Sequence, residues 1–259
     1  MKQETLKAYL NEAADRHNHT DFIDNDPISI PHQFSKLQDI EIIGFWTAML
    51  AWGQRKTIIN KANELVERMD GSPYDFILHH QEEDRKAFLT FKHRTFQPTD
   101  TLYFLEFLQQ YYQQHESLET AFLPDGQRTD SVEASLIHFH HLFFSLPFAP
   151  QRTRKHLATP ARKSTCKRLN MFLRWMVRQD DRGVDFGLWR RIEPHQLLIP
   201  LDVHVDRVAR RLGLLRRKQT DWLSVLELTE QLRRFNANDP VRYDFALFGD
   251  GVLEKKTIR

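Results

Sequence analysis

One cysteine, Cys166, is present among the 259 residues of this chain. A lone thiol cannot build an intramolecular disulfide, a cysteine-based zinc site or a four-cysteine iron–sulfur cluster. The N-terminal sequence also lacks the apolar core of a signal peptide, and no apolar run approaches the length needed to span a membrane. We therefore expect a protein of the reducing cytoplasm with no membrane partner, no metal cluster and no cofactor.

Several sequence signatures of catalysis are missing as well. Glycine-rich phosphate loops, G-x-S-x-G elbows and paired carboxylates at a recognisable spacing do not occur. His138, His140 and His141 fall at i, i+2 and i+3, a spacing that does not direct three imidazoles of one helix to a single metal ion. We interpret them as partly exposed helix residues and predict no metal site.

Strand-like alternation of apolar and polar residues is absent, whereas helical spacing is common. Apolar spacing and capping residues predict helices at 36–52, 57–69, 101–114, 132–146, 165–177, 186–192, 203–212, 220–235 and 240–248. Thr99 or Asp100 can cap the third of these, Ser131 the fourth and Asp239 the last. We predict an all-α fold in which residues 1–259 form a single unit with approximate lobes 36–125 and 126–259. The N-terminal helix 1–18 is expected to pack on the second lobe.

The net charge is nearly balanced, at +2, but it is unevenly distributed. Residues 151–179 contain no Asp or Glu, and a second basic cluster lies at 207–218. The first cluster consists of Arg152, Arg154, Lys155, Arg162, Lys163, Lys167, Arg168, Arg174 and Arg178. Such a basic face is the expected footprint of a protein that binds nucleic-acid phosphates, although basic helix faces are also common as solvated surface.

The segment PLDVHVDRVARRL, residues 200–212, places one carboxylate at the start of a basic amphipathic helix. Pro200 disfavours helix at the residue before it, Asp202 is a good N-cap, and Gly213 can end the helix. A carboxylate that accepts backbone N–H bonds at a helix start is held ionised, which suits a group facing a developing positive charge. Asp202 is therefore either a plain cap or a fixed counter-charge.

Three segments carry a resemblance to a known family. LDVHVDRVARRLGL, 201–214, is similar to the V-D-x-H-x-x-R-V segment of helix-hairpin-helix DNA glycosylases of the endonuclease III and 8-oxoguanine glycosylase superfamily. FWTAMLAWGQRKTIINKANEL, 45–65, resembles the family's segment in which a glutamine, here Gln54, precedes a helix containing N-K-A. YDFALFGDG, 243–251, resembles its closing helix near the lesion pocket. Because the chain lacks the four cysteines that bind an iron–sulfur cluster, the resemblance points to the members of this superfamily that have no cluster.

The family's catalytic lysine begins the second helix of the hairpin. The resemblance assigns this role to Lys167 of STCKRLNMFL, with Lys163 as the competitor under a shifted alignment. The chain departs from the family in lacking the hairpin glycines and in carrying a long insertion, 180–196, between lysine and aspartate. Because hairpin glycines let the backbone approach a phosphate closely, their absence bears on DNA anchoring more than on the chemistry.

The resemblance implies a bifunctional DNA glycosylase and AP lyase of base-excision repair. Lys167 would attack C1′ and form a Schiff base, while Asp202 would stabilise the cationic sugar. The flipped base would enter a pocket for which Gln54, Trp52, Phe245 and Phe248 are candidates, although Gln54 can equally be an exposed polar residue at a helix end. The DNA-binding candidates are Arg152, Arg154, Lys155, Arg162, Lys163, Arg168, His204 and Arg207.

We therefore expect a monomeric, nucleoid-associated enzyme whose partner is double-stranded DNA with a damaged base, an oxidised purine being the first substrate hypothesis. The main alternative is a non-enzymatic protein of the same fold that recognises distorted DNA, with Lys167 as one phosphate contact among its basic neighbours. A third interpretation is an all-α scaffold for a protein partner, which would leave the basic clusters without a polyanion.

Overall fold

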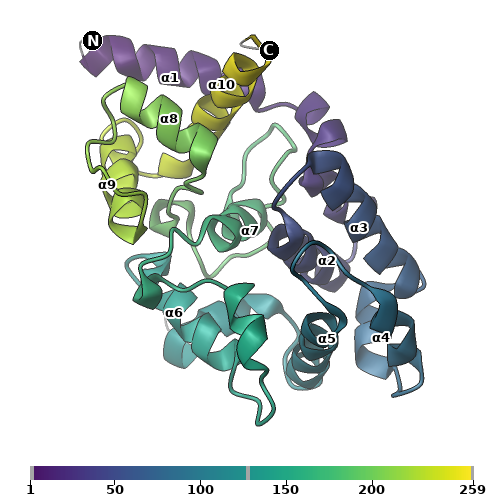
Figure 1. Ribbon diagram of the computed structural model, residues 1–259. Helices are drawn as coiled ribbons and strands as arrows, with labels where there is room; N and C mark the ends of the chain where they lie inside the picture. The colour runs from purple at the N-terminus through teal and green to yellow at the C-terminus, as the bar shows by residue number, and fades with distance from the viewer. Residues whose placement is uncertain (1–2, 127–128, 258–259) are drawn as a thin grey trace. The chain divides into compact units, whose positions relative to one another are not determined.

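The computed structural model describes residues 3–126 and 129–257, and it confirms an all-α fold (Figure 1). Every named element among those residues is an α-helix or a short 3-10 helix. The α-helices are α1 (Gln3–His17), α2 (Leu37–Leu50), α3 (Arg55–Arg68), α4 (Pro73–His79), α5 (Pro98–Tyr112), α6 (Val132–Phe143), α7 (Lys167–Val177), α8 (Val203–Arg211), α9 (Trp222–Arg233) and α10 (Asp244–Thr257). None of the described helices combines the length and the apolarity needed to cross a membrane.

Contacts divide the chain into two compact units. The terminal unit takes its residues from 1–22, 129–134 and 159–259, and the central unit takes its residues from 23–128 and 135–158. This division differs from the approximate lobes 36–125 and 126–259, because most of α6 and the segment after it pack with the central unit. The chain therefore crosses from one unit to the other several times.

An aromatic core explains why α6 belongs with the central unit. Phe139 and Phe143 of α6 pack against Phe45 of α2, at ring-centroid distances of 5.6 and 6.0 Å, and Phe143 lies 4.8 Å from Phe104 of α5. All four rings are fully buried. Burial of large aromatic side chains is among the strongest contributions to core stability, so these contacts fix α2, α5 and α6 together.

In the terminal unit, the first and last helices lie side by side, and α10 also packs against α8 (Figure 1). Two glycines of α10 permit this close approach. A Cβ at Gly251 would lie 2.9 Å from Cβ of His204 on α8, and one at Gly249 would overlap the ring of His17 on α1. A side chain at Gly251 would meet the backbone of α8 at His204, and one at Gly249 would displace the His17 ring.

The predicted caps were mostly correct. Asp202 caps α8, Ser131 Oγ accepts from the backbone N–H of Glu133 in the first turn of α6, and Asp239 caps the 3-10 helix Pro240–Tyr243 that leads into α10. The cap predicted for α5 was wrong, because the N-cap is Gln97, whose backbone N–H donates to Asp100 at 2.8 Å. Asp100 thus closes a capping box from the third position of the helix.

The short helix predicted at 186–192 does not form. The chain instead lies back along the end of α7, where the backbone N–H of Phe186 donates to the Trp175 carbonyl and that of Trp189 to the Met176 carbonyl. These bonds satisfy carbonyls at the C-terminal end of α7 that an isolated helix would leave without partners. The apolar residues that suggested a helix, Trp189 and Ile192, are buried by this packing.

Candidate active site

Asp202 is held rigidly at the start of α8. Its carboxylate accepts the backbone N–H groups of His204, at 2.8 Å, and Val205, at 3.0 Å. These bonds confirm the capping geometry predicted from the sequence, and they fix the orientation of the carboxylate. The side chain is half-buried, so one edge of the group stays accessible.

Lys167 is the first residue of α7 and is half-buried. Its ammonium lies 3.4 Å from Met171 Sδ, one turn along the same helix. A thioether sulfur is a weak hydrogen-bond acceptor. A cation at the N-terminal end of a helix also opposes the helix dipole. Helix stability therefore does not account for a lysine at this position.

Asp244, the first residue of α10, is the member of the site that the sequence reasoning missed. Its carboxyl is 5 % exposed, and while Oδ2 accepts from Arg174, Oδ1 has no hydrogen-bond partner among the described residues. Burial raises the pKa of Asp244 to about 6, the charges of Arg174 and Lys167 oppose that rise, and the negative charge of Asp202 adds to it. Asp202 and Lys167 therefore both lie close enough to the Asp244 carboxyl for their charges to change its pKa.

Three helices thus place a titratable side chain at their first turn in the same part of the terminal unit. Lys167 comes from α7, Asp202 precedes α8 and Asp244 begins α10. An amine, a fixed carboxylate and a buried carboxyl with a raised pKa are the groups needed for nucleophilic attack and for proton transfer near neutral pH. A strongly perturbed pKa beside specific charge partners is a recognised marker of functional sites.

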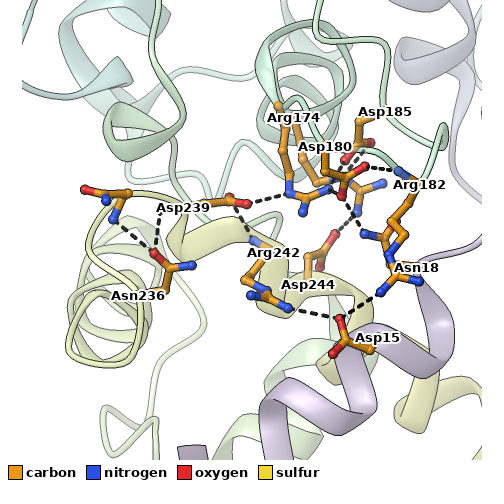
Figure 2. A network of polar contacts seen from close by, with 12 residues as sticks. Asp15, Asn18, Arg174, Asp180, Arg182, Asp185, Asn236, Asp239, Arg242 and Asp244 are labelled. Carbon is orange, nitrogen blue, oxygen red and sulfur yellow. Dashed lines mark hydrogen bonds and ion pairs between the residues drawn. The ribbon is translucent and has the colours of Figure 1, made fainter.

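A buried network of arginines and aspartates supports Asp244 (Figure 2). Arg174 of α7 binds Asp185, at 3.2 Å, as well as Asp244. One turn later, Arg178 binds Asp180 at 2.7 Å, Asp185 at 3.2 Å and Asp239 at 2.9 Å. Both arginines are less than 5 % exposed.

This network corrects the proposed basic face. Arg174 and Arg178 were counted with it because the segment 151–179 contains no acidic residue, but aspartates from later segments neutralise them in the interior. Asp180 and Asp185 come from the segment 180–196, which lies between Lys167 and Asp202 in sequence. This segment therefore supplies two of the four carboxylates and helps to position the Arg174–Asp244 pair beside the candidate site.

Two residues other than glycine adopt the left-handed conformation in the segment before α7. Lys163 and Cys166 both adopt the left-handed conformation, with φ of 59° and 49°. Glycine populates this region freely, whereas other residues enter it at a cost of roughly 1 kcal/mol. Lys163 is exposed at this turn, while Lys167 lies beyond it on the helix, so the two candidate lysines occupy distinct environments.

The DNA-binding candidates are divided between the units. In the terminal unit, Arg162, Lys163 and Arg207 are exposed, whereas Arg168 is half-buried and burial lowers its pKa to about 10. His204 is half-buried and its Nδ1 lies 3.1 Å from the Gly251 carbonyl, which also accepts from Arg207 at 2.6 Å. A desolvated guanidinium is a poor surface contact for phosphate, so Arg168 is the weakest of these candidates.

In the central unit, the remaining candidates lie on the 3-10 helix Gln151–Lys155. Lys155 is exposed, Arg154 lies 4.7 Å above the ring of Phe144, and Arg152 binds the fully buried Asp100 at 2.6 Å. Arg152 therefore has a carboxylate partner within the protein, which leaves Lys155 as the better phosphate contact.

The four residues suggested for the base pocket are divided between the two units. Trp52 and Gln54 belong to the central unit, where Trp52 packs on His93 and His156 and Gln54 is exposed at the N-cap of α3. Phe248, in the terminal unit, is half-buried beside His204, at 5.9 Å between rings.

Phe245 is 1 % exposed, and its ring is covered by Arg174 at 4.4 Å and Arg178 at 5.3 Å. This side chain is therefore a buried residue under the arginine network. The ring contributes cation–π contacts that help to hold the two buried guanidinium groups in place.

Over residues 3–126 and 129–257, no group of three or more His, Cys, Asp or Glu side chains is arranged to hold a metal ion. In the comparisons with known proteins, a family model described as a protein of unknown function (DUF2400) matches residues 26–253. No curated protein matches the chain, and no solved structure matches it.

Proposed function

Since the chain belongs to the DUF2400 family, whose description assigns no activity, we propose from the site itself that the protein is a DNA glycosylase with AP-lyase activity. The observation that carries the proposal is the placement of Lys167, Asp202 and Asp244 at three neighbouring helix starts, with the charges of the first two acting on the third. The substrate we propose is a damaged base, first of all an oxidised purine, in double-stranded DNA. The protein would act as a monomer on cytoplasmic, nucleoid DNA.

The proposed chemistry uses the amine of Lys167 and the carboxylate of Asp202. The amine of Lys167 attacks C1′ of the deoxyribose, the N-glycosidic bond breaks, and the base leaves with its electron pair and takes a proton. Asp202 stabilises the positive charge that develops on the sugar and accepts the proton released from the lysine amine. C1′ then carries the lysine nitrogen and the ring oxygen O4′; the bond from C1′ to O4′ breaks as O4′ takes the proton back from Asp202, and the resulting Schiff base allows β-elimination to cut the strand.

Borohydride trapping of the unmodified protein tests this proposal. Borohydride reduces a lysine Schiff base to a stable amine, so we expect a covalent protein–DNA adduct on at least one duplex of a panel carrying oxidised purines, oxidised pyrimidines or an abasic site. The adduct should migrate as protein plus DNA on a denaturing gel. Binding to every duplex without any adduct would favour the non-enzymatic alternative, in which the same fold only recognises distorted DNA.

The raised pKa of Asp244 predicts a specific pH dependence of stability. A carboxyl whose pKa rises from 3.8 to about 6 on folding binds a proton more tightly in the folded state. Its contribution is therefore present at low pH and is lost as the pH rises through about 6. Asp244→Asn, which is neutral at every pH, should gain stability relative to the parent by about 2–3 kcal/mol as the pH rises from about 4 to about 7.

Urea unfolding of both proteins at several pH values measures this difference. The aspartates and glutamates whose pKa values are lowered, such as Asp100 and Asp180, act in the opposite direction but are common to both proteins and cancel. A difference in unfolding free energy that stays constant over this pH range would show that Asp244 is ionised throughout.

A further inference from the structure

The turn that joins α6 to the basic 3-10 helix of the central unit presents an unusual side chain. Phe148 is 92 % exposed, the highest value among the exposed large apolar residues of the described chain. A single exposed apolar side chain is ordinary on a protein surface, so the exposure of Phe148 alone indicates no partner. The backbone and the charges around the ring carry the argument.

The backbone holds Phe148 in place. The N–H of Ala149 donates to the Leu146 carbonyl at 3.1 Å, which closes a β-turn with Pro147 and Phe148 at its two central positions. Proline at the first of these positions restricts the turn before any ligand arrives. The ring is thus displayed on a short, constrained segment, and little conformational entropy of the backbone is lost when it binds.

The residues after the turn are anchored to the core. Pro150 is the N-cap of the 3-10 helix Gln151–Lys155. In this helix, Thr153 Oγ1 donates to Asp100 at 2.7 Å and Arg152 Nη1 donates to the same carboxylate at 2.6 Å. His156 Nε2 lies 3.2 Å from Asp100 as well. Asp100 is fully buried on α5, so the segment that carries Phe148 and Lys155 is fixed at its far end.

The cations near the turn indicate the chemistry of the partner. The segment 148–155 carries the exposed ring and three cations within eight residues. Arg152 is paired with Asp100 and Arg154 lies over the ring of Phe144, so the exposed Lys155 is the cation best placed to meet a ligand. An aromatic face next to cationic side chains is the arrangement with which proteins bind unpaired nucleobases, since the base stacks on the ring while its phosphates meet the cations. We propose that the turn Leu146–Pro150 is a stacking site for an unpaired nucleobase, with Lys155 contacting the adjoining phosphate.

This inference goes beyond the proposed glycosylase, because it involves neither Lys167 nor any bond-breaking step. It concerns bases that are already free of pairing, as in single strands and bulges. A binding assay without a catalytic readout can therefore test it whether or not the protein excises a base.

The test measures binding to a single-stranded oligodeoxynucleotide that contains 2-aminopurine, whose fluorescence falls on stacking. Phe148→Ala should weaken binding by about 5- to 100-fold and remove the quenching, while Phe148→Trp should retain both. Leu89→Ala is the matched control, because Leu89 is 54 % exposed in the same unit but lies outside the basic segment. Binding of a fully paired duplex should change by less than about twofold in Phe148→Ala, because its bases are not available to stack on the ring.

Salt dependence separates stacking from charge. Phe148→Ala removes no charge, so the slope of log affinity against log salt should stay that of the parent, whereas Lys155→Ala should reduce it by about one unit. The proposal is overturned if Phe148→Ala binds the single strand as tightly as the parent, or if Leu89→Ala loses as much affinity. Loss of binding to anionic lipid vesicles by Phe148→Ala, with oligonucleotide binding intact, would also overturn it in favour of a membrane contact.

Discussion

Lys167→Gln is expected to abolish the borohydride-trapped adduct altogether. A Schiff base requires a primary amine, and an amide nitrogen cannot replace it. Glutamine keeps most of the length of the side chain and remains a hydrogen-bonding group, so α7 should form as before. DNA binding should survive with at most a modest loss, because one cation among several is removed.

Lys163→Gln is the matched control for this result. Lys163 lies four residues earlier on the exposed turn, so its loss should weaken DNA binding and leave trapping intact at saturating protein. The opposite pattern, in which Lys163→Gln loses the adduct and Lys167→Gln keeps it, would transfer the nucleophile to Lys163. Full trapping by both single variants would remove the assignment of either lysine.

Asp202→Asn should reduce base excision by about a hundredfold or more while leaving the fold nearly unchanged. Asparagine is as good an N-cap as aspartate, so the bonds from His204 and Val205 can persist and the free energy of unfolding should change by less than about 1 kcal/mol. The variant loses only the negative charge that stabilises the sugar cation. Single-turnover excision and urea unfolding measure the two effects separately, and DNA binding should be equal or tighter because an anion has been removed.

Asp221→Asn provides the comparison that isolates the site. Asp221 caps α9 in the same way, accepting from the backbone N–H of Ser224 at 3.2 Å. Its substitution should leave excision at the parent rate. If Asp202→Asn also excises at the parent rate, Asp202 is a cap and nothing more.

The local features of the fold were predictable from the sequence. Asp202 and Ser131 act within a few residues of their own position, so proline, capping side chains and apolar spacing were enough to locate α6 and α8. Apolar spacing also located α7, in which Phe172, Trp175 and Met176 are buried. The predicted helices differ from the observed ones in three places: no helix forms at 186–192, α4 was not predicted, and α10 continues to Thr257, well past the expected end at 248.

Charges that meet across long sequence separations were not predictable in this way. Arg174 and Arg178 looked like surface cations because no acid lies near them in sequence, yet their partners include Asp239 and Asp244, more than sixty residues later. Asp244 was not predicted as a site residue because most of its neighbours in sequence are apolar, among them Phe245 and Phe248. A signal was available, since an aspartate at the start of a mostly apolar helix must be desolvated when that helix is buried.

The pairing of α1 with α10 has a consequence for the order in which the chain can fold. Tyr9 and Asp250, which hydrogen-bond to each other, are 241 residues apart, so these two helices meet only after almost the whole chain has been synthesised. Until then Leu6, Leu10, Ala13 and Ala14 of α1, all buried in the finished protein, have no apolar surface to cover them. Contacts of such long range are costly in loop-closure entropy and tend to form late. During synthesis α1 therefore docks late, only after α10 has left the ribosome.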